Sequence, residues 1–269
     1  MIGTILLVLV GGLAVLIVML WIGLQIKPRP FPDYPHQTPP LESVPLPGDL
    51  PAPVARYYHA IAGHTIPVIR SAVLTGPARL RIGPITFNGR FRFTHVAGRD
   101  YRHYIEATIF GLPLFKVNEF YLDGNSRLEL PVGVTEGDPK VNQAANLGLW
   151  GESIWLPSIF ITDPRVRWEA IDDTSARLIV PFGAEEEAFT VVFDADTGLI
   201  TRMETMRYKT DTKIRWILEM RGWATFHGVQ IPSPAAVTWE DEGTPWAVFT
   251  IKDAAYNVDV ADYVRQHGL

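Results

Sequence analysis

Apolar and polar side chains alternate with a period of two through most of the chain. In residues 85–96, Phe91 and Phe93 alternate with Arg90 and Arg92, and the same pattern recurs in later segments. Such alternation is typical of half-buried antiparallel strands joined by hairpin turns. Roughly six such segments lie in the first half and about seven or eight in the second, with no helix between successive strands. We therefore predict a mainly β (α+β) fold, a curved antiparallel sheet or open half-barrel of about 11–14 strands.

Three short helices interrupt this pattern. Residues 53–62 carry an apolar stripe at helical spacing between a proline and a glycine, which suit the start and the end of a helix. Further helices are predicted over 140–156 and 259–267. Residues 54–269 would then form a single antiparallel β domain.

The segment 144–161 carries only one charge, that of Glu152. It could be a second membrane span, a core helix or a lid. A span would bury this carboxylate and be broken at Pro157, so we reject it. A helix that is apolar nearly all round must be covered on most sides, as it would be across the concave face of a curved sheet. Three small residues would allow close approach to the sheet or to a ligand: Ala145, Gly148 and Gly151.

The N-terminal segment is long and uncharged. Residues 5–26 would span about 33 Å as a helix, close to the thickness of a hydrocarbon core. A cleaved signal peptide would have a basic start, a shorter apolar stretch and a small-residue cleavage site, and none of these is evident. We predict a retained single-pass transmembrane anchor over 1–26, in the cell membrane. Lys27 and Arg29 after the span would place the domain in the cytoplasm, whereas the resemblance given below favours the outer side, so orientation stays open.

Residues 27–53 contain ten prolines. Because proline lacks an amide donor and favours extended polyproline II backbone, this stretch can be neither a helix nor a central strand. We predict a Pro-rich tether. It could hold the domain away from the lipid, at about 3.1 Å per residue, or it could pack in part along the domain surface.

Composition narrows the classes of function. The chain of 269 residues has a net charge of −5 and no long run of Lys or Arg. We therefore expect no nucleic-acid partner, because phosphate neutralisation needs a basic face. The absence of cysteine excludes disulfides, thiolate metal sites and cysteine nucleophiles. The sequence also contains no P-loop, GxGxxG or GxSxG motif, and we expect no cofactor.

A few polar residues are candidates for chemistry. His95 and His103 could face each other across a hairpin as a metal-binding pair, or be two polar residues on a wet strand face; we favour the second and expect no metal site. Glu152 could be a general acid with a pKa raised by desolvation, or a buried anchor paired with an arginine. The arginine candidates are Arg90, Arg92 and Arg167, and the second-carboxylate candidates for a hydrolase are Glu169 and Asp173.

Several motifs resemble a bacterial family of uncharacterised, membrane-anchored proteins that share a domain of unknown function. They are "LPAPVARYYHAIAG", "WGESIWLPSIFI", "FTVVFDADTGLITRMETMRY" and "GVQIPSPAAVTWEDEGTPWAVFTI", and the resemblance covers most of residues 50–257. More remotely, the order of strands, apolar helix and further strands is similar to the half-barrels of Lol-type lipoprotein carriers. That resemblance implies a sheet and helical lids that shelter acyl chains.

We therefore predict a membrane-tethered binding or carrier module for an apolar ligand, a lipid or lipid-linked molecule, rather than an enzyme. The ligand would lie between the curved sheet and the apolar helix. The candidate cavity residues are Phe91, Phe93, Leu147, Trp150, Glu152, Ile154, Trp155 and Trp168. Expected partners are membrane lipid, an apolar small molecule and a membrane protein. The alternatives are a structural or assembly subunit of a membrane complex, without a cavity, and a carboxylate-based hydrolase.

Overall fold

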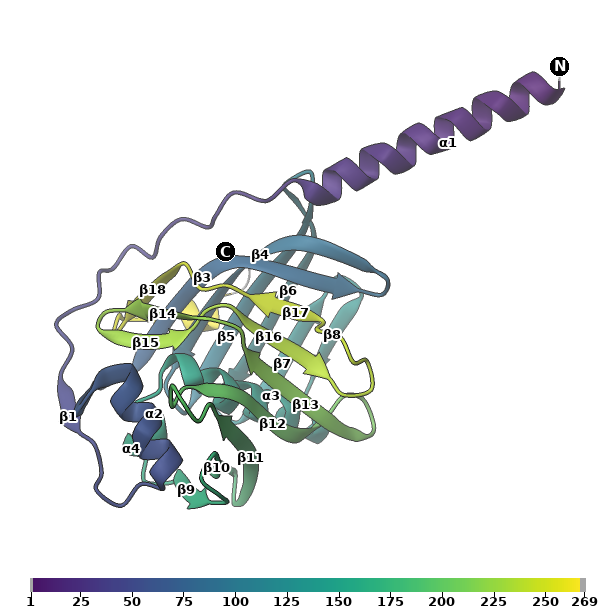
Figure 1. Ribbon diagram of the computed structural model, residues 1–269. Helices are drawn as coiled ribbons and strands as arrows, with labels where there is room; N and C mark the ends of the chain where they lie inside the picture. The colour runs from purple at the N-terminus through teal and green to yellow at the C-terminus, as the bar shows by residue number, and fades with distance from the viewer. Residues whose placement is uncertain (1, 267–269) are drawn as a thin grey trace.

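The computed structural model describes residues 2–266, and its first helix stands apart from the rest (Figure 1). Helix α1 (Ile2–Gln25) is exposed along almost its whole length. Among the described residues it is the one helix long and apolar enough to cross a membrane, over Thr4–Gln25. A signal sequence near the N-terminus would satisfy the same criteria of length and composition.

An antiparallel sheet of 14 strands forms the body of the described chain. Six of its strands precede helix α3: β3 (Ser71–Ile82), β4 (Ile85–Val96), β5 (Asp100–Ile109), β6 (Leu112–Leu122), β7 (Asn125–Leu130) and β8 (Gly133–Glu136). Eight follow it: β9 (Arg167–Ala170), β10 (Ser175–Phe182), β11 (Glu185–Phe193), β12 (Ile200–Tyr208), β13 (Lys213–Met220), β16 (Ala235–Trp239), β17 (Ala247–Phe249) and β18 (Asp253–Tyr256). Their order is β8-β7-β6-β5-β4-β3-β17-β16-β13-β12-β11-β10-β9, with β18 also paired to β3. Within the described residues the edge strands β8 and β9 do not pair, so the predicted open antiparallel sheet is confirmed.

Two smaller sheets and two further helical elements complete this part of the described fold. Strand β1 (Ser43–Pro45) pairs with β2 (Thr65–Pro67), and β14 (Trp223–Phe226) pairs with β15 (Val229–Pro232). Helix α2 (Ala52–Ala62) buries an apolar stripe against the core. The helix predicted over 259–267 is shorter than expected: it is a 3₁₀ turn, η2 (Tyr263–Arg265), and residues 267–269 lie outside the described residues.

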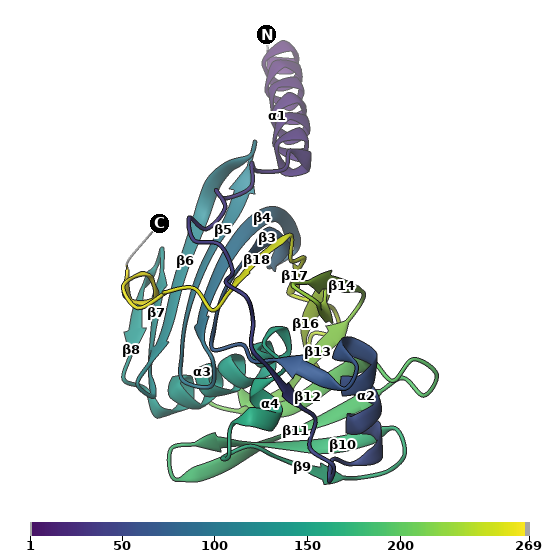
Figure 2. The ribbon, with the colours of Figure 1, turned by 90° about the vertical axis from the view of Figure 1, so that its left-hand side faces the viewer.

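Helix α3 (Pro139–Glu152) lies in the concave face of the sheet, between its two halves (Figure 2). The helix begins after Asp138, whose side chain accepts a hydrogen bond from the Lys140 N–H. It ends earlier than the predicted residue 156 and continues as a 3₁₀ turn, η1 (Ser153–Trp155), and a short helix, α4 (Ile159–Thr162). Pro157 explains this break, because proline disfavours α-helical backbone at the residue before it.

Two buried amides tie α3 to both halves of the sheet. Asn146 donates to the Pro181 carbonyl of β10 at 3.0 Å and accepts from the Tyr121 hydroxyl of β6 at 3.2 Å. Gln143 donates to the Met206 carbonyl of β12 at 3.2 Å. Because these bonds are made away from water, each stabilises one position of the helix against the curved sheet.

The first part of the Pro-rich tether lies on the outer face of the sheet, and its later part continues to β1 and α2 (Figure 2). Phe31 is only 5% exposed, and the Arg90 guanidinium lies 4.2 Å from its ring centroid. Tyr34 donates to the Asp259 carbonyl at 2.8 Å and packs edge-on against Tyr263. Of the two conformations considered for this segment, the structure therefore shows the one that packs along the domain.

The end of α1 contacts the hairpin between β5 and β6. The N–H of Phe110 donates to the Gly23 carbonyl at 2.8 Å, and Asn88 donates to the Leu24 carbonyl at 2.8 Å. These donors satisfy carbonyls that the last turn of a helix leaves unpaired. A Cβ on Gly23 would lie 2.7 Å from the Phe110 ring, so this close approach requires glycine. Phe110 itself has a φ of 54°, a conformation unfavourable for a bulky residue, which the contact with α1 offsets.

Candidate functional site

Two histidines from neighbouring strands share the concave face of the sheet. β4 pairs with β5 so that His95 is opposite Tyr101 and His103 is opposite Phe93, which places the two imidazoles diagonally across the ladder. His95 and His103 are 1% and 4% exposed. The expectation of two polar residues on a wet strand face is therefore wrong, because strand alternation places them on the same face as the core residue Phe93.

Glu152, the last residue of α3, brings a carboxylate to these imidazoles. Its Oε2 lies 2.6 Å from His103 Nε2 and 3.4 Å from His95 Nε2. One ligand atom from each of the three residues lies within 4.8 Å of the other two. The end of a helix and two strands thus meet at one buried point.

Glu119 and Tyr101 form a second layer behind His103. Glu119 Oε2, from β6, lies 3.6 Å from His103 Nδ1. The Tyr101 hydroxyl donates to Glu119 Oε1 at 2.6 Å, and the Tyr101 ring stacks on the His103 ring with centroids 4.0 Å apart. These contacts fix the orientation of the His103 ring. We call His95, His103, Glu119 and Glu152 the His–Glu cluster.

The charges of the cluster shift the pKa values of its members in opposite directions. Burial opposes the charged form of His103, but Glu152 and Glu119 outweigh it and raise the pKa of His103 to about 9. Burial would also raise the pKa of Glu152, yet His103 and His95 lower the pKa of Glu152 to about 2. Burial lowers the pKa of His95. The alternative of a general acid with a raised pKa at Glu152 is therefore not found, because the neighbours of Glu152 include two imidazoles and are not apolar groups alone.

None of the predicted arginines pairs with Glu152. Arg90 pairs with Glu106 at 2.6 Å, and Arg167 pairs with Glu186. Arg92 donates to the Pro32 carbonyl and to the Tyr263 hydroxyl. Arg90 and Arg92 alternate with Phe91 and Phe93 along β4, so their side chains point to the convex face, away from Glu152.

The carboxylates suggested for a hydrolase do not join Glu152 either. Glu169 lies on the edge strand β9, where it is paired with Arg167 at 3.4 Å and with Arg177 at 3.6 Å. Asp173 is exposed, and its carbonyl accepts a hydrogen bond from Arg56. The described residues therefore do not hold the predicted carboxylate pair.

The apolar cavity candidates meet in the main hydrophobic core. Six of them are at most 3% exposed: Phe91, Phe93, Leu147, Trp150, Ile154 and Trp155. They pack against each other, with the Phe93 and Trp155 rings 5.9 Å apart, and Trp155 Nε1 donates to the Pro232 carbonyl at 3.0 Å. Trp168 is partly buried at the edge of this core. The structure thus brings the predicted residues together as packed side chains, and a role in ligand binding stays a prediction for them.

A hollow of about 640 Å³ lies instead on the convex face, under the tether. It is lined by tether residues between 27 and 33, by parts of β3 and β4, and by residues between 248 and 253. We call it the tether groove. One end of the tether groove is at Lys27, two residues after the last residue of α1, Gln25.

The tether groove combines apolar walls with cationic side chains. Its cations are Lys27, Arg79, Arg90 and Lys252, and its carboxylates are Asp33 and Asp253. Among the described residues, only Arg90 of these four cations has a carboxylate partner, Glu106. Burial and the neighbouring Asp33 raise the pKa of Asp253. The groove is therefore net cationic in a chain whose net charge is −5.

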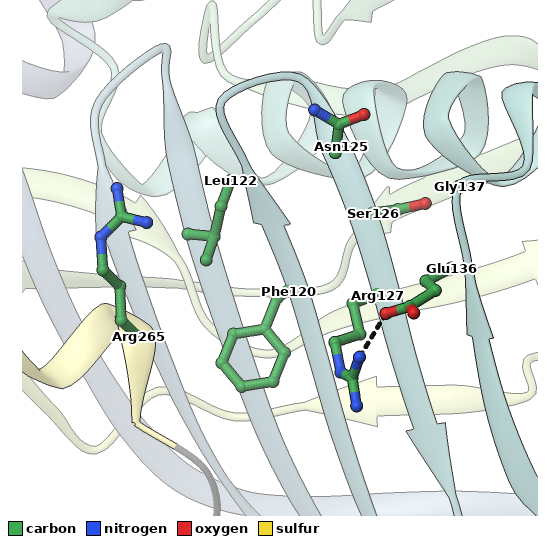
Figure 3. Close-up of a pocket in the computed structure, with 8 residues that line it drawn as sticks. All are labelled: Phe120, Leu122, Asn125, Ser126, Arg127, Glu136, Gly137 and Arg265. Carbon is green, nitrogen blue, oxygen red and sulfur yellow. Dashed lines mark hydrogen bonds and ion pairs between the residues drawn. The ribbon is translucent and has the colours of Figure 1, made fainter.

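A second hollow, of about 460 Å³, lies on the outer face of β6 and β7 (Figure 3). Phe120 and Leu122 form its floor, and Arg265 approaches from the C-terminal segment. The guanidinium of Arg127 points to Glu136 across one side of the hollow. This hollow is therefore bordered by an ion pair of its own and does not communicate with the His–Glu cluster on the concave face.

The family assignment follows from a comparison with known families. Residues 42–251 match the model of DUF6544, a family of unknown function. The chain belongs to this family. The resemblance to an uncharacterised family, predicted from the sequence motifs, is thereby confirmed. No protein with a curated function matches the chain.

Two solved structures are similar in backbone. A LolA superfamily protein from Nitrosomonas europaea shows 10% identity and a TM-score of 0.49, covering 80% of this chain and 96% of that one. A DUF1329 family protein from Desulfovibrio piger shows 14% identity and a TM-score of 0.44, covering 74% of this chain and 91% of that one. The first of these is named as a member of the superfamily to which the order of elements was likened.

The sequence prediction missed Glu119, Tyr101 and the tether groove. A signal for the first two was present, since Glu119 and Tyr101 occupy the same alternating positions as apolar residues of β6 and β5. A carboxylate on an apolar strand face predicts a buried partner. The groove has no such local signal, because it forms only when the tether packs on the sheet.

Proposed function

We propose that the chain is a membrane-anchored protein that binds one phospholipid, or a molecule linked to such a lipid, in the tether groove. The observation that supports this most directly is the position of the groove beside the end of the apolar helix α1. At that position, cations that have no carboxylate partner among the described residues lie next to apolar walls. The apolar ligand predicted from the sequence is kept, but its site moves from the concave to the convex face.

The size and charge of the groove suit such a ligand. A volume of about 640 Å³ is typical of pockets that take small molecules. Arg79, Lys252 and Lys27 would bind the phosphate, and each basic residue near an anionic lipid surface contributes about 1 kcal/mol. The apolar walls, such as Phe31 and Val248, would cover the first part of an acyl chain, at about 0.8 kcal/mol for each buried CH₂.

The carboxylates of the groove add a preference among headgroups. Asp33 and Asp253 both line the groove, and each carboxylate makes the binding of another anion beside it less favourable. They would instead accept an ammonium group. We therefore expect phosphatidylethanolamine, which carries both a phosphate and an ammonium, to bind more tightly than phosphatidylglycerol.

Native mass spectrometry of the full chain, released from nanodiscs of mixed phosphatidylethanolamine and phosphatidylglycerol, tests this proposal. The double variant Arg79→Glu/Lys252→Glu should lose one retained phospholipid, because two of the phosphate ligands become carboxylates. Lipids that surround α1 are the same in every variant and therefore cancel in the comparison.

The matched control is Arg177→Glu, a charge reversal on β10 at the end of the domain far from α1 (Figure 2). It should retain lipid like the unmodified chain. The proposal fails if the unmodified chain retains no more lipid than the double variant, or if the control loses lipid equally.

A further inference from the structure

We infer that His95, His103 and Glu152 bind one divalent transition-metal ion in the interior of the domain. This site lies on the concave face of the sheet, whereas the tether groove lies on the convex face. The inference is therefore independent of the lipid proposal and can hold or fail separately.

The first argument is convergence. The ligand atoms of the three side chains lie within 4.8 Å of one another, and they come from β4, β5 and the end of α3. Tetrahedral ligands about 2.0–2.1 Å from a zinc ion lie about 3.3 Å apart. The contact of 3.4 Å between His95 Nε2 and Glu152 Oε2 already fits this spacing. The contact of 2.6 Å between His103 Nε2 and Glu152 Oε2 would need to lengthen.

The second argument is the unpaired atoms. Both ring nitrogens of His95, the Nε2 of His103 and the Oε2 of Glu152 are buried and make no hydrogen bond in the structure. The 2.6 Å contact is short, but its angles are not those of a hydrogen bond. Buried polar atoms without partners are costly and rare. His95 Nε2 and His103 Nε2 both lie close to Glu152 Oε2, and three such atoms close together without hydrogen bonds are the arrangement expected of ligands around a cation.

An ion pair without a metal explains only part of this arrangement. A protonated His103 between Glu152 and Glu119 would be well compensated. It would leave His95, which is 1% exposed, with neither ring nitrogen paired. A metal ion bound through His95 Nε2 would give that nitrogen a partner, so the set of three residues favours the metal.

The third argument is the layer behind the ligands. A metal-binding histidine almost always has a carboxylate, a carbonyl or a water at its other ring nitrogen. Here Glu119 Oε2 lies 3.6 Å from His103 Nδ1, and Tyr101 holds Glu119 through a 2.6 Å hydrogen bond. Two imidazoles and one carboxylate suit Zn²⁺, Fe²⁺, Mn²⁺ or Co²⁺, and they disfavour Ca²⁺ and Mg²⁺, which prefer oxygen ligands alone.

The test is a titration of the full chain in detergent, after removal of metal with a chelator, by Co²⁺ and then Zn²⁺. We expect one equivalent of Co²⁺ to give visible d–d absorption, and Zn²⁺ to displace it. The variants His95→Gln and Glu152→Gln should lose this signal, with binding weakened at least hundredfold. The control His64→Gln removes an exposed histidine that packs edge-on against His59, and it should bind like the unmodified chain.

A thermal melt of the unmodified chain keeps the inference testable if the variants fail to fold. At a Zn²⁺ concentration a hundredfold above Kd, we expect Tm to rise by roughly 5–10 °C. The inference is overturned if the folded, metal-free chain takes up no stoichiometric Co²⁺ or Zn²⁺ and shows no such rise. Equal binding by Glu152→Gln and the unmodified chain would overturn it as well.

Discussion

Glu119 shows how a single side chain outside the inferred ligand set can control a buried site. Its carboxylate lies between the His103 ring and the Tyr101 hydroxyl, so it contacts no ligand atom that would face the metal. We expect Glu119→Gln to weaken Zn²⁺ affinity about 10–100-fold without abolishing binding, because His103 loses its charged partner. Competition with a chromophoric chelator measures this affinity. The control is Glu136→Gln, which removes an exposed carboxylate on β8 and should leave the Zn²⁺ affinity unchanged. An unchanged Zn²⁺ affinity in Glu119→Gln would show that the Glu119 carboxylate does not orient His103.

The residues of the His–Glu cluster also show what the sequence can reveal. The alternation of Phe91 and Phe93 predicts the buried face of β4, and His95 continues it at the next position on that face. Local pattern therefore suffices to bury the histidines. It does not bring Glu152 to them, because that contact depends on how α3 crosses the sheet. Because the local pattern does not show which strand residues α3 meets, arginines were expected as the partners of Glu152.

Helix α3 is the element whose packing most depends on small residues. A Cβ on Gly151 would lie 2.8 Å from Leu218 and 3.0 Å from Trp216, whereas a Cβ on Gly148 would meet nothing closer than 3.5 Å. We expect Gly151→Ala to lower the free energy of unfolding by about 1–3 kcal/mol through overpacking. Gly148→Ala should instead raise it by about 0.5–1 kcal/mol, because alanine favours the helix. Urea denaturation of both variants measures the difference, and equal effects would show that α3 can shift away from β13.

The elements divide into those that a local pattern predicts and those that it does not. Period-two alternation identified the strands on both sides of α3, since each strand carries its own pattern of burial. The end of α3 at Glu152 was missed, because the sequence 153–156 is still apolar and only the backbone before Pro157 departs from helix. The sequence also left the path of the tether undecided, because proline restricts the backbone conformation of this segment but does not determine which surface the segment contacts.

At the scale of the whole molecule, the contacts of α1 would set how the domain faces a membrane if α1 is the anchor proposed above. Phe110 and Asn88 donate hydrogen bonds to the last turn of α1, and these contacts oppose free rotation of the domain about its tether. Two hairpin turns at that end of the sheet carry large apolar residues that are 44–68% exposed: Ile82, Ile85, Phe110, Leu112 and Leu114. If α1 is the proposed anchor, these exposed apolar groups are expected to enter the membrane interface. The tether groove would then lie at the level of the lipid headgroups.

Single-cysteine labelling can test this orientation, because the natural chain contains no cysteine. A polarity-sensitive fluorophore on Leu112→Cys, at the tip nearest α1, should shift to shorter wavelength in nanodiscs and be quenched by brominated lipid. The same label on Ala184→Cys, in the exposed turn between β10 and β11 at the opposite end, should do neither. If both labels report water, the domain stands off the bilayer despite its contacts with α1, and a lipid could not pass directly into the groove. Lipid access would then require the tether to detach, so the position of Leu112 decides between a groove at the membrane surface and one remote from it.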